Sequence, residues 1–190
     1  MANVDRPFGF TPIGTSDGAD YHGKLREVEF LDTDATAAYV GDMVALTGTT
    51  GADGLTPVVT RAAAGASIIG AIVSFEPTFE DEGSLTLNYR EASTARKAKV
   101  CFGSEVLYSV QTSNGTIAAG DFGQNIDLAA GAGNNITGIS GMTVDVGTVV
   151  GATAQFRLRH IERAIDNELG EFARVIVNVN ENQDDNGTGV

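Results

Sequence analysis

The chain of 190 residues has no tryptophan, one cysteine, Cys101, and only two histidines, His22 and His160. A lone cysteine cannot form an internal disulfide, so stability must come from packing or from assembly. No stretch approaches the roughly 20 apolar residues that span a bilayer, and residues 1–11 lack the apolar core of a signal peptide. We therefore expect neither membrane insertion nor secretion.

Basic residues are also scarce. The chain has 12 lysine and arginine residues against 25 aspartate and glutamate residues, which gives a formal net charge of −13. This charge makes a close approach to phosphate backbones unfavourable, so nucleic acid is not an expected partner. Hydrophobic residues make up 42% of the chain, which is enough for one compact core at this length.

Short segments with a period of two predict half-buried strands. Val28 and Phe30, for example, alternate with Glu27 and Glu29. More continuously apolar segments predict central strands, and the 24 glycines supply turns between them. The expected fold is an all-β antiparallel sandwich or barrel with at most one or two short helices, at Asp32–Tyr39 and Ile161–Leu169. The other expected strands are Leu85–Tyr89, Lys97–Phe102, Ala154–His160, Ile68–Phe75 and Val175–Val179.

We expect one β-rich domain over residues 24–180, preceded by an extended arm and followed by a polar, frayed tail over residues 181–190. The arm, residues 1–23, mixes proline and glycine with apolar side chains such as Phe8 and Phe10. Such side chains indicate docking onto a partner, and packing against the chain's own domain is the alternative.

Signals for catalysis or metal binding are weak. Neither histidine has a recognisable nucleophile setting nearby, His160 is predicted to be buried in its strand, and Cys101 is interpreted as a small filler residue. We expect no enzyme activity, no cofactor and no metal. An enzyme would require a cleft that brings distant carboxylates together, such as Asp121, Asp127 and Glu162.

Charge is clustered between residues 76 and 99. An acidic run of Glu76 and residues 80–82 precedes a basic one that contains Arg90 and Arg96. Neighbouring subunits can pair such runs, and two solvated loops on one monomer are the alternative.

Several segments, in order, resemble the small decoration, or cement, proteins on the heads of tailed bacteriophages. The similarity extends to about Asn180, and the acidic tail departs from it. The segments are Arg6–Pro12, Tyr21–Gly23, Thr36–Val44, Tyr89–Arg96, Val106–Gln111, Asp121–Leu128, Asp166–Gly170 and Val177–Asn180.

This resemblance implies a non-enzymatic virion protein, made in the bacterial host cytoplasm, that binds the outer capsid surface and bridges neighbouring subunits. The expected partners are the major capsid protein and copies of the chain itself, as homotrimers or alternatively dimers. We expect the arm to dock by strand addition and the basic hairpin to meet an acidic patch. The alternatives are a minor head or tail-associated subunit and a glycan-binding β-module. The interface residues predicted on these grounds are Arg6, Pro7, Phe8, Phe10, Pro12, Arg90 and Arg96.

Overall fold

The computed structural model describes residues 3–77 and 87–184 and confirms an all-β fold. Within these residues the only helical segment is a single 3-10 turn, η2, at Ala119–Asp121. The strands are β1 (Thr11–Thr15), β2 (Leu25–Phe30), β3 (Ala38–Tyr39), β4 (Met43–Thr50), β5 (Pro57–Arg61), β6 (Gly70–Phe75), β7 (Tyr89–Arg90), β8 (Arg96–Phe102), β9 (Val106–Ser113), β10 (Asn125–Ala129), β11 (Thr143–Val150), β12 (Phe156–Ile161) and β13 (Arg174–Val179).

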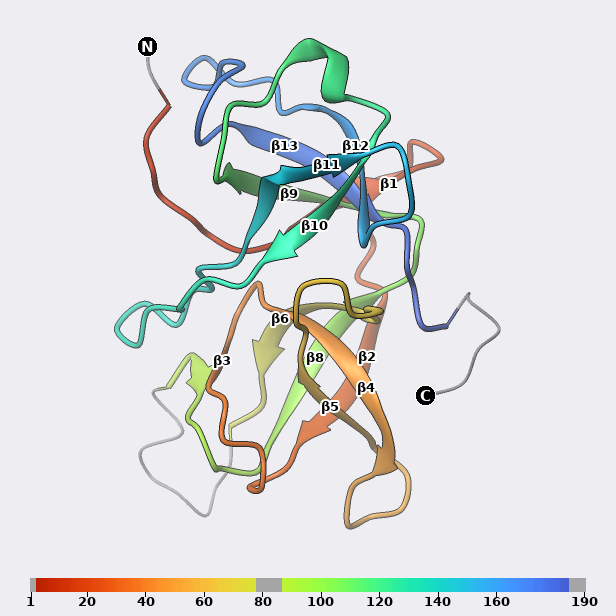
Figure 1. Cartoon of the computed structure of the whole chain (residues 1–190). Coiled ribbons are helices and arrows are strands. Elements are labelled where there is room, and N and C mark those ends of the chain that lie inside the picture. Colours follow the sequence, from red (N-terminus) through yellow and green to blue (C-terminus); the bar gives the residue numbers. More distant parts are fainter. Residues whose placement is uncertain (1–2, 78–86, 185–190) are drawn as a thin grey trace.

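One closed barrel, drawn at the bottom of Figure 1, has the strand order β2-β5-β4-β6-β8. Its β2 and β8 pair in antiparallel register, with Glu27 opposite Lys99 and Val28 opposite Ala98. Val28 and Ala98 are buried, whereas the Lys99 ammonium lies 2.6 Å from the Glu27 carboxylate on the outside. The period of two in these segments therefore reports the inner and outer faces of the barrel, as predicted.

The upper half of Figure 1 is a second sheet with the order β1-β9-β11-β10-β12-β13. Because β13 also pairs with β9, the strands β9, β11, β10, β12 and β13 close a ring, which we call the upper ring. One core cluster joins side chains of the ring, such as Phe156 and Tyr108, to side chains of the lower barrel, such as Met43 and Ala71. The two halves therefore share this core cluster, and a second cluster, with Phe30 and Ile72 among its members, fills the lower barrel.

The predicted separate arm is wrong for its second half. Thr11–Thr15 pairs with β9 as β1, and Phe10 is 1% exposed. The Phe10 ring stacks on Phe156 at 4.8 Å between centroids and meets the edge of Tyr108 at 6.4 Å. Phe10 thus fills the chain's own core, because aromatic burial there stabilises the upper ring more than exposure on a tail would.

The start of the predicted tail is also part of the domain. Asn182 is 1% exposed, and its neighbours bond to the lower barrel: the Ile68 amide donates to the Glu181 carbonyl at 2.9 Å, and the Gln183 amide donates to the Ile68 carbonyl at 3.0 Å. Fraying from residue 181 is therefore wrong, since residues 181–184 are fixed by backbone hydrogen bonds. Residues 185–190, the acidic run 80–82 and the start of the Leu85–Tyr89 strand lie outside the described residues.

Two further predictions fail for local reasons. The pairing of β12 with β13 shifts register between Leu158 and His160, and this bulge turns the His160 side chain outward, where it is exposed. The segments Asp32–Tyr39 and Ile161–Leu169 form no helix: residues 32–37 and 162–169 are turns and loops, Ala38–Tyr39 is β3, and Ile161 ends β12. Their weak helical pattern loses to the tertiary contacts of the adjoining strands. Cys101 is fully buried, as a filler residue would be.

Candidate docking groove

Arg90, predicted to meet an acidic patch on a partner, is instead fully buried on β7. Its guanidinium donates hydrogen bonds to four backbone carbonyls: Thr94 at 2.7 Å, Thr36 at 2.5 Å, Leu31 at 2.6 Å and Asp34 at 2.7 Å. Burial lowers the pKa of Arg90, and the nearby Asp34 carboxylate opposes this effect. Arg90 therefore fastens two loops of its own chain, and the interface prediction for it is wrong.

Arg96 has the same role one strand further on. It is 6% exposed and donates to the carbonyls of Glu76 at 3.0 Å, Tyr89 at 2.5 Å and Leu87 at 2.9 Å. Burial lowers its pKa as well. A planar guanidinium suits this task because its five donors are fixed in one plane, and so both arginines are structural.

The first part of the arm does lie on the surface. Arg6 and Pro7 are exposed, and Phe8 and Pro12 are half-buried. Nothing tests whether they contact a partner, so this remains a prediction for these four residues. The structure does show what holds the arm in place.

A glutamine side chain from β9 clips the arm to the domain. The Gln111 carboxamide donates to the carbonyls of Val4 at 2.8 Å and Phe172 at 3.1 Å, and accepts from the Arg6 amide at 2.9 Å. A second carboxamide, that of Asn3, donates to the Glu168 carbonyl at 2.8 Å. Two amide side chains thus replace the backbone ladder that a paired strand would have.

The clipped arm forms one wall of a groove of about 1300 Å³. The opposite wall is the loop between β10 and β11, residues 131–141, which projects from the molecule in Figure 1. Gln111, Phe172 and Arg174 lie along the floor. The groove is open and carries charges of both signs, since Asp5 and Arg6 lie on the arm. Such a concave, mixed surface can take an extended chain or another flat polar partner.

The far wall presents one fully exposed apolar side chain. Ile136 is 94% exposed, and the Asn134 carboxamide oxygen accepts its backbone amide at 2.8 Å and that of Thr137 at 3.1 Å. At the base of the loop, a Cβ on Gly131 would lie 1.8 Å from the Gly141 carbonyl oxygen, so only glycine allows the two backbones to approach this closely. The loop turns at residues 135–138, and these contacts fix the backbone at Ile136.

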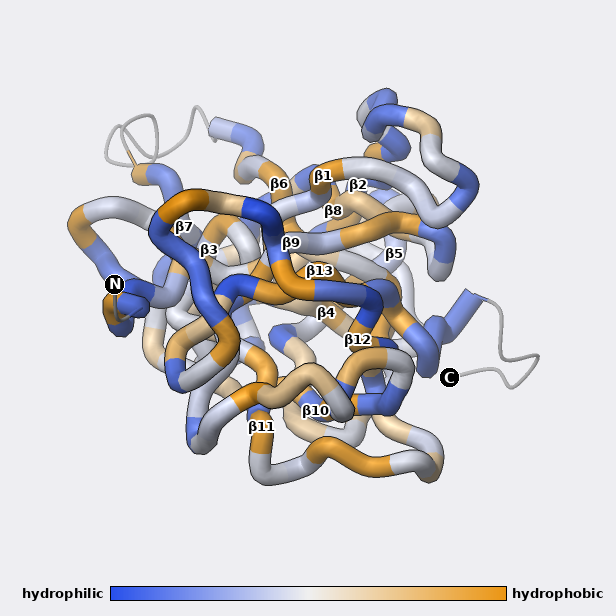
Figure 2. The backbone as a smooth tube through the Cα atoms, turned by 90° about the horizontal axis from the view of Figure 1, so that it is seen from above, coloured by the Kyte–Doolittle hydropathy of each residue, from blue (hydrophilic) through white to orange (hydrophobic). Residues whose placement is uncertain are grey.

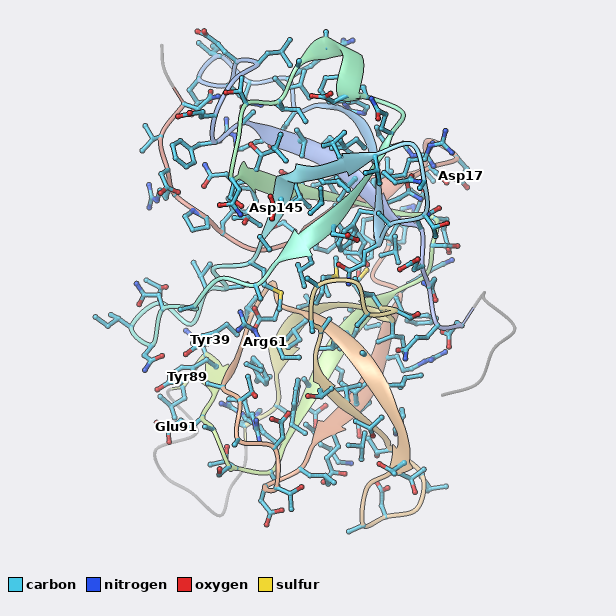
Figure 3. The ribbon with its side chains drawn as sticks, in the orientation of Figure 1. Asp17, Tyr39, Arg61, Tyr89, Glu91 and Asp145 are labelled. Carbon is cyan, nitrogen blue, oxygen red and sulfur yellow. The ribbon has the colours of Figure 1, made fainter. Side chains whose placement is uncertain are left out.

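A buried ion pair anchors this wall to the lower barrel. Asp42 is fully buried and accepts the Arg61 guanidinium at 2.9 Å and the Ser140 hydroxyl at 2.5 Å, while Arg61 also donates to the Gly131 carbonyl. Burial raises the pKa of Asp42, and Arg61 opposes the rise. Figure 3 shows Arg61 and Tyr39 at the level where the two halves meet. Because both ends of the loop touch this network, the network sets the position of the wall.

The floor of the groove contains a strained aromatic residue. Phe172 has φ +54°, the left-handed region that costs a bulky residue roughly 1–2 kcal/mol. Its carbonyl is one of the acceptors that Gln111 holds. Strain of this kind persists where the surroundings impose it, and it concentrates at functional sites.

The carboxylates that an enzyme would need have separate structural partners. Asp121 accepts the Ala118 amide at 2.7 Å, and Asp127 accepts the Gln155 amide at 3.0 Å. Glu162 accepts the Ser109 hydroxyl at 2.8 Å. Among residues 3–77 and 87–184, no three His, Cys, Asp or Glu side chains gather as a metal site. In the same residues, no helix is both long and apolar enough to cross a membrane.

Comparisons of the chain with models of protein families, with curated proteins and with solved structures find no match. The interpretation of the groove as a docking site therefore depends on its geometry alone. Sequence reasoning missed Gln111, Asn134, Ile136 and Phe172. Of these four residues, only Gln111 is marked in the sequence, because it is a polar residue directly after the largely apolar segment 106–110.

Proposed function

We propose that the chain is a structural protein of a tailed-phage particle that binds the outer surface of the capsid and bridges neighbouring capsid subunits. In this role it is not an enzyme, and the bacterial host makes it in its cytoplasm. Its partners are the major capsid protein and further copies of itself. The proposal rests on the resemblance in sequence and on one feature of the fold.

That feature is the rigid wall of the groove with Ile136 at its tip. Large apolar side chains in this fold are mostly buried, and Figure 2 shows hydrophobic segments along the strands as well as in a few outer loops. Ile136 is 94% exposed, and the hydrogen bond from its backbone amide to Asn134 restricts its backbone before any partner arrives. Preorganisation of this kind lowers the entropy cost of binding and suits a docking contact.

The expected strength per copy is modest, as a decoration protein allows. Burying one isoleucine side chain contributes about 1.5–3 kcal/mol. Hydrogen bonds from the groove add about 1 kcal/mol each. Many copies on one shell, or several sites in one oligomer, then make the attachment firm through multivalency.

The test is co-sedimentation of purified protein with undecorated shells from the same source. Ile136→Asp places a charge at the proposed contact and should reduce shell binding at least tenfold. The control is Leu55→Asp, because Leu55 is 85% exposed on the loop between β4 and β5, far from the groove. Equal loss in both variants, or in neither, would contradict the role of the groove.

Copy number separates decoration from the alternatives. A decoration protein saturates shells at hundreds of copies, whereas a minor head or tail-associated subunit binds at a few. A glycan-binding module would ignore the shells and bind host polysaccharide instead. No binding to shells by the wild-type chain would overturn the proposal.

A further inference from the structure

Some turns of the fold place a glycine directly after an aspartate or an asparagine. Because glycine has no side chain to hinder the approach, its amide nitrogen can attack the side-chain carbonyl carbon of the residue before it. Whether this happens in a folded protein depends on how firmly the two reacting groups are held. The described residues contain three such steps, Asp17–Gly18, Asp53–Gly54 and Asn114–Gly115, and Asn186–Gly187 lies outside them.

The two aspartates are held by hydrogen bonds. Asp17 accepts the Ala19 amide at 3.2 Å and the Thr15 hydroxyl. Asp53 accepts the amide and the hydroxyl of Thr56 at 2.8 Å and 2.6 Å. The hydrogen bonds from Thr15 and Thr56 lower the pKa of the carboxyl groups that they contact, and a carboxylate is a poor target for a nucleophile. Both aspartates are therefore protected from attack.

Asn114 is not held in this way. It directly follows β9, its side chain is exposed, and its φ of +57° is one that asparagine tolerates in a turn. Among residues 3–77 and 87–184, neither its carboxamide nor the Gly115 amide has a hydrogen-bond partner. The turn accounts for the presence of this residue pair, since asparagine and glycine both suit positive φ. The same turn leaves both reacting groups free.

We propose that Asn114 is a site of spontaneous deamidation in the folded protein. The Gly115 nitrogen bonds to the Asn114 side-chain carbonyl carbon, and the side-chain nitrogen leaves as ammonia, which carries away the proton of the Gly115 amide. Water then opens the cyclic imide. Opening at the side-chain carbonyl gives aspartate, and opening at the main-chain carbonyl gives isoaspartate, in which the main chain runs through the former side chain. This chemistry is independent of the proposed function.

The site lies where the upper ring closes. Just before it, Thr112 pairs with Val144 and Ser113 pairs with Asp145, and these pairs join β9 to β11. Isoaspartate lengthens the main chain directly after this short pairing. Either product also adds a negative charge close to Asp145, which is labelled in Figure 3. Like charges at this distance repel, so we expect the modified protein to be less stable.

The test compares the folded chain with the urea-unfolded chain in mildly alkaline buffer. Chymotrypsin releases the peptide Ser109–Phe122, in which Asn114 is the sole asparagine. Mass spectrometry detects the exchange of amide for acid, and chromatography separates the isoaspartyl peptides of all three steps. The folded-to-unfolded rate ratio should be about tenfold or more higher at Asn114 than at Asp17 or Asp53, because an exposed turn without hydrogen bonds opens at a low free-energy cost.

A variant isolates the effect on stability. Asn114→Gln lengthens the side chain and slows ring closure, so its urea midpoint should stay constant during an incubation that lowers the midpoint of wild type. Asn186 and Gly187 are present in both proteins, so their reaction cannot produce the difference. Equal rate ratios at the three steps, or an unmodified 109–122 peptide from the folded protein while the unfolded chain reacts, would overturn the proposed site. A modified wild type with an unchanged midpoint would overturn its effect on the ring.

Discussion

Replacing Arg90 tests the structural account most sharply, because the interface prediction and the structure disagree about it. If Arg90 served a partner, Arg90→Ala would spare the fold and weaken assembly. In the structure the same change removes four hydrogen bonds to backbone carbonyls and the guanidinium that lies 5.3 Å from the Phe30 ring centre. The two accounts predict opposite results.

The magnitude follows from those four hydrogen bonds. A hydrogen bond contributes about 1 kcal/mol to stability, and more when the donor is charged, so losing four costs about 4 kcal/mol. A typical domain has only about 5–15 kcal/mol of stability, so Arg90→Ala should be barely folded. Arg90→Lys keeps the charge but not the planar set of donors, and it should lose about half as much.

Urea denaturation followed by circular dichroism measures the free energy of unfolding for these variants. The control is Arg6→Ala, whose side chain is exposed, and it should stay within about 0.5 kcal/mol of wild type. If Arg90→Ala matched this control, the reasoning that assigns Arg90 to the loops would be refuted.

Three further predictions concern the groove and the lower barrel. Asp42→Ala leaves the half-buried Arg61 without its carboxylate partner and should cost about 3 kcal/mol in urea denaturation; a loss below 1 kcal/mol would contradict the anchoring network. Gln111→Ala should cost about 2 kcal/mol and make the arm near Phe8 sensitive to thermolysin; unchanged cleavage would show that the clip is dispensable. Hydrogen bonds from Lys99 and Lys97 lower the pKa of Glu27 from 4.5 to about 2. The folded state therefore binds this proton less readily than the unfolded state, and the stability that Glu27 contributes is present above pH 4.5 and is lost as the pH falls toward 2. Glu27→Gln should make the urea midpoint depend less on pH over that range. The same pH dependence in wild type and variant would contradict the assignment.

The strands could be predicted because their period of two is a local signal. Val28 and Glu27 differ in polarity for the same reason that they lie on different faces of β2. The position of His160 could not be predicted, since a single bulge inverts the pattern and leaves no mark in the alternation. Phe10 was ambiguous because an apolar side chain near a terminus fits both a docking arm and a core.

The groove was beyond sequence reasoning because its parts meet only in three dimensions. Gln111 and Val4 are 107 residues apart along the chain. Arg90 illustrates the same limit: a cation in a basic run looks like a surface charge, and nothing local reveals carbonyls that lie 54 to 59 residues away. Polar side chains that satisfy distant backbone groups are the residues most easily mistaken for functional ones.

Hydrogen–deuterium exchange of the shell-bound protein tests the central claim directly, because it reports which segments become covered. The account predicts slower exchange in residues 3–8 and 131–141 when the protein is on shells. The loop around Leu55 should exchange as in the free protein. Protection confined to other segments, or no change on mixing with shells, would contradict the claim that the chain docks on a capsid through this groove.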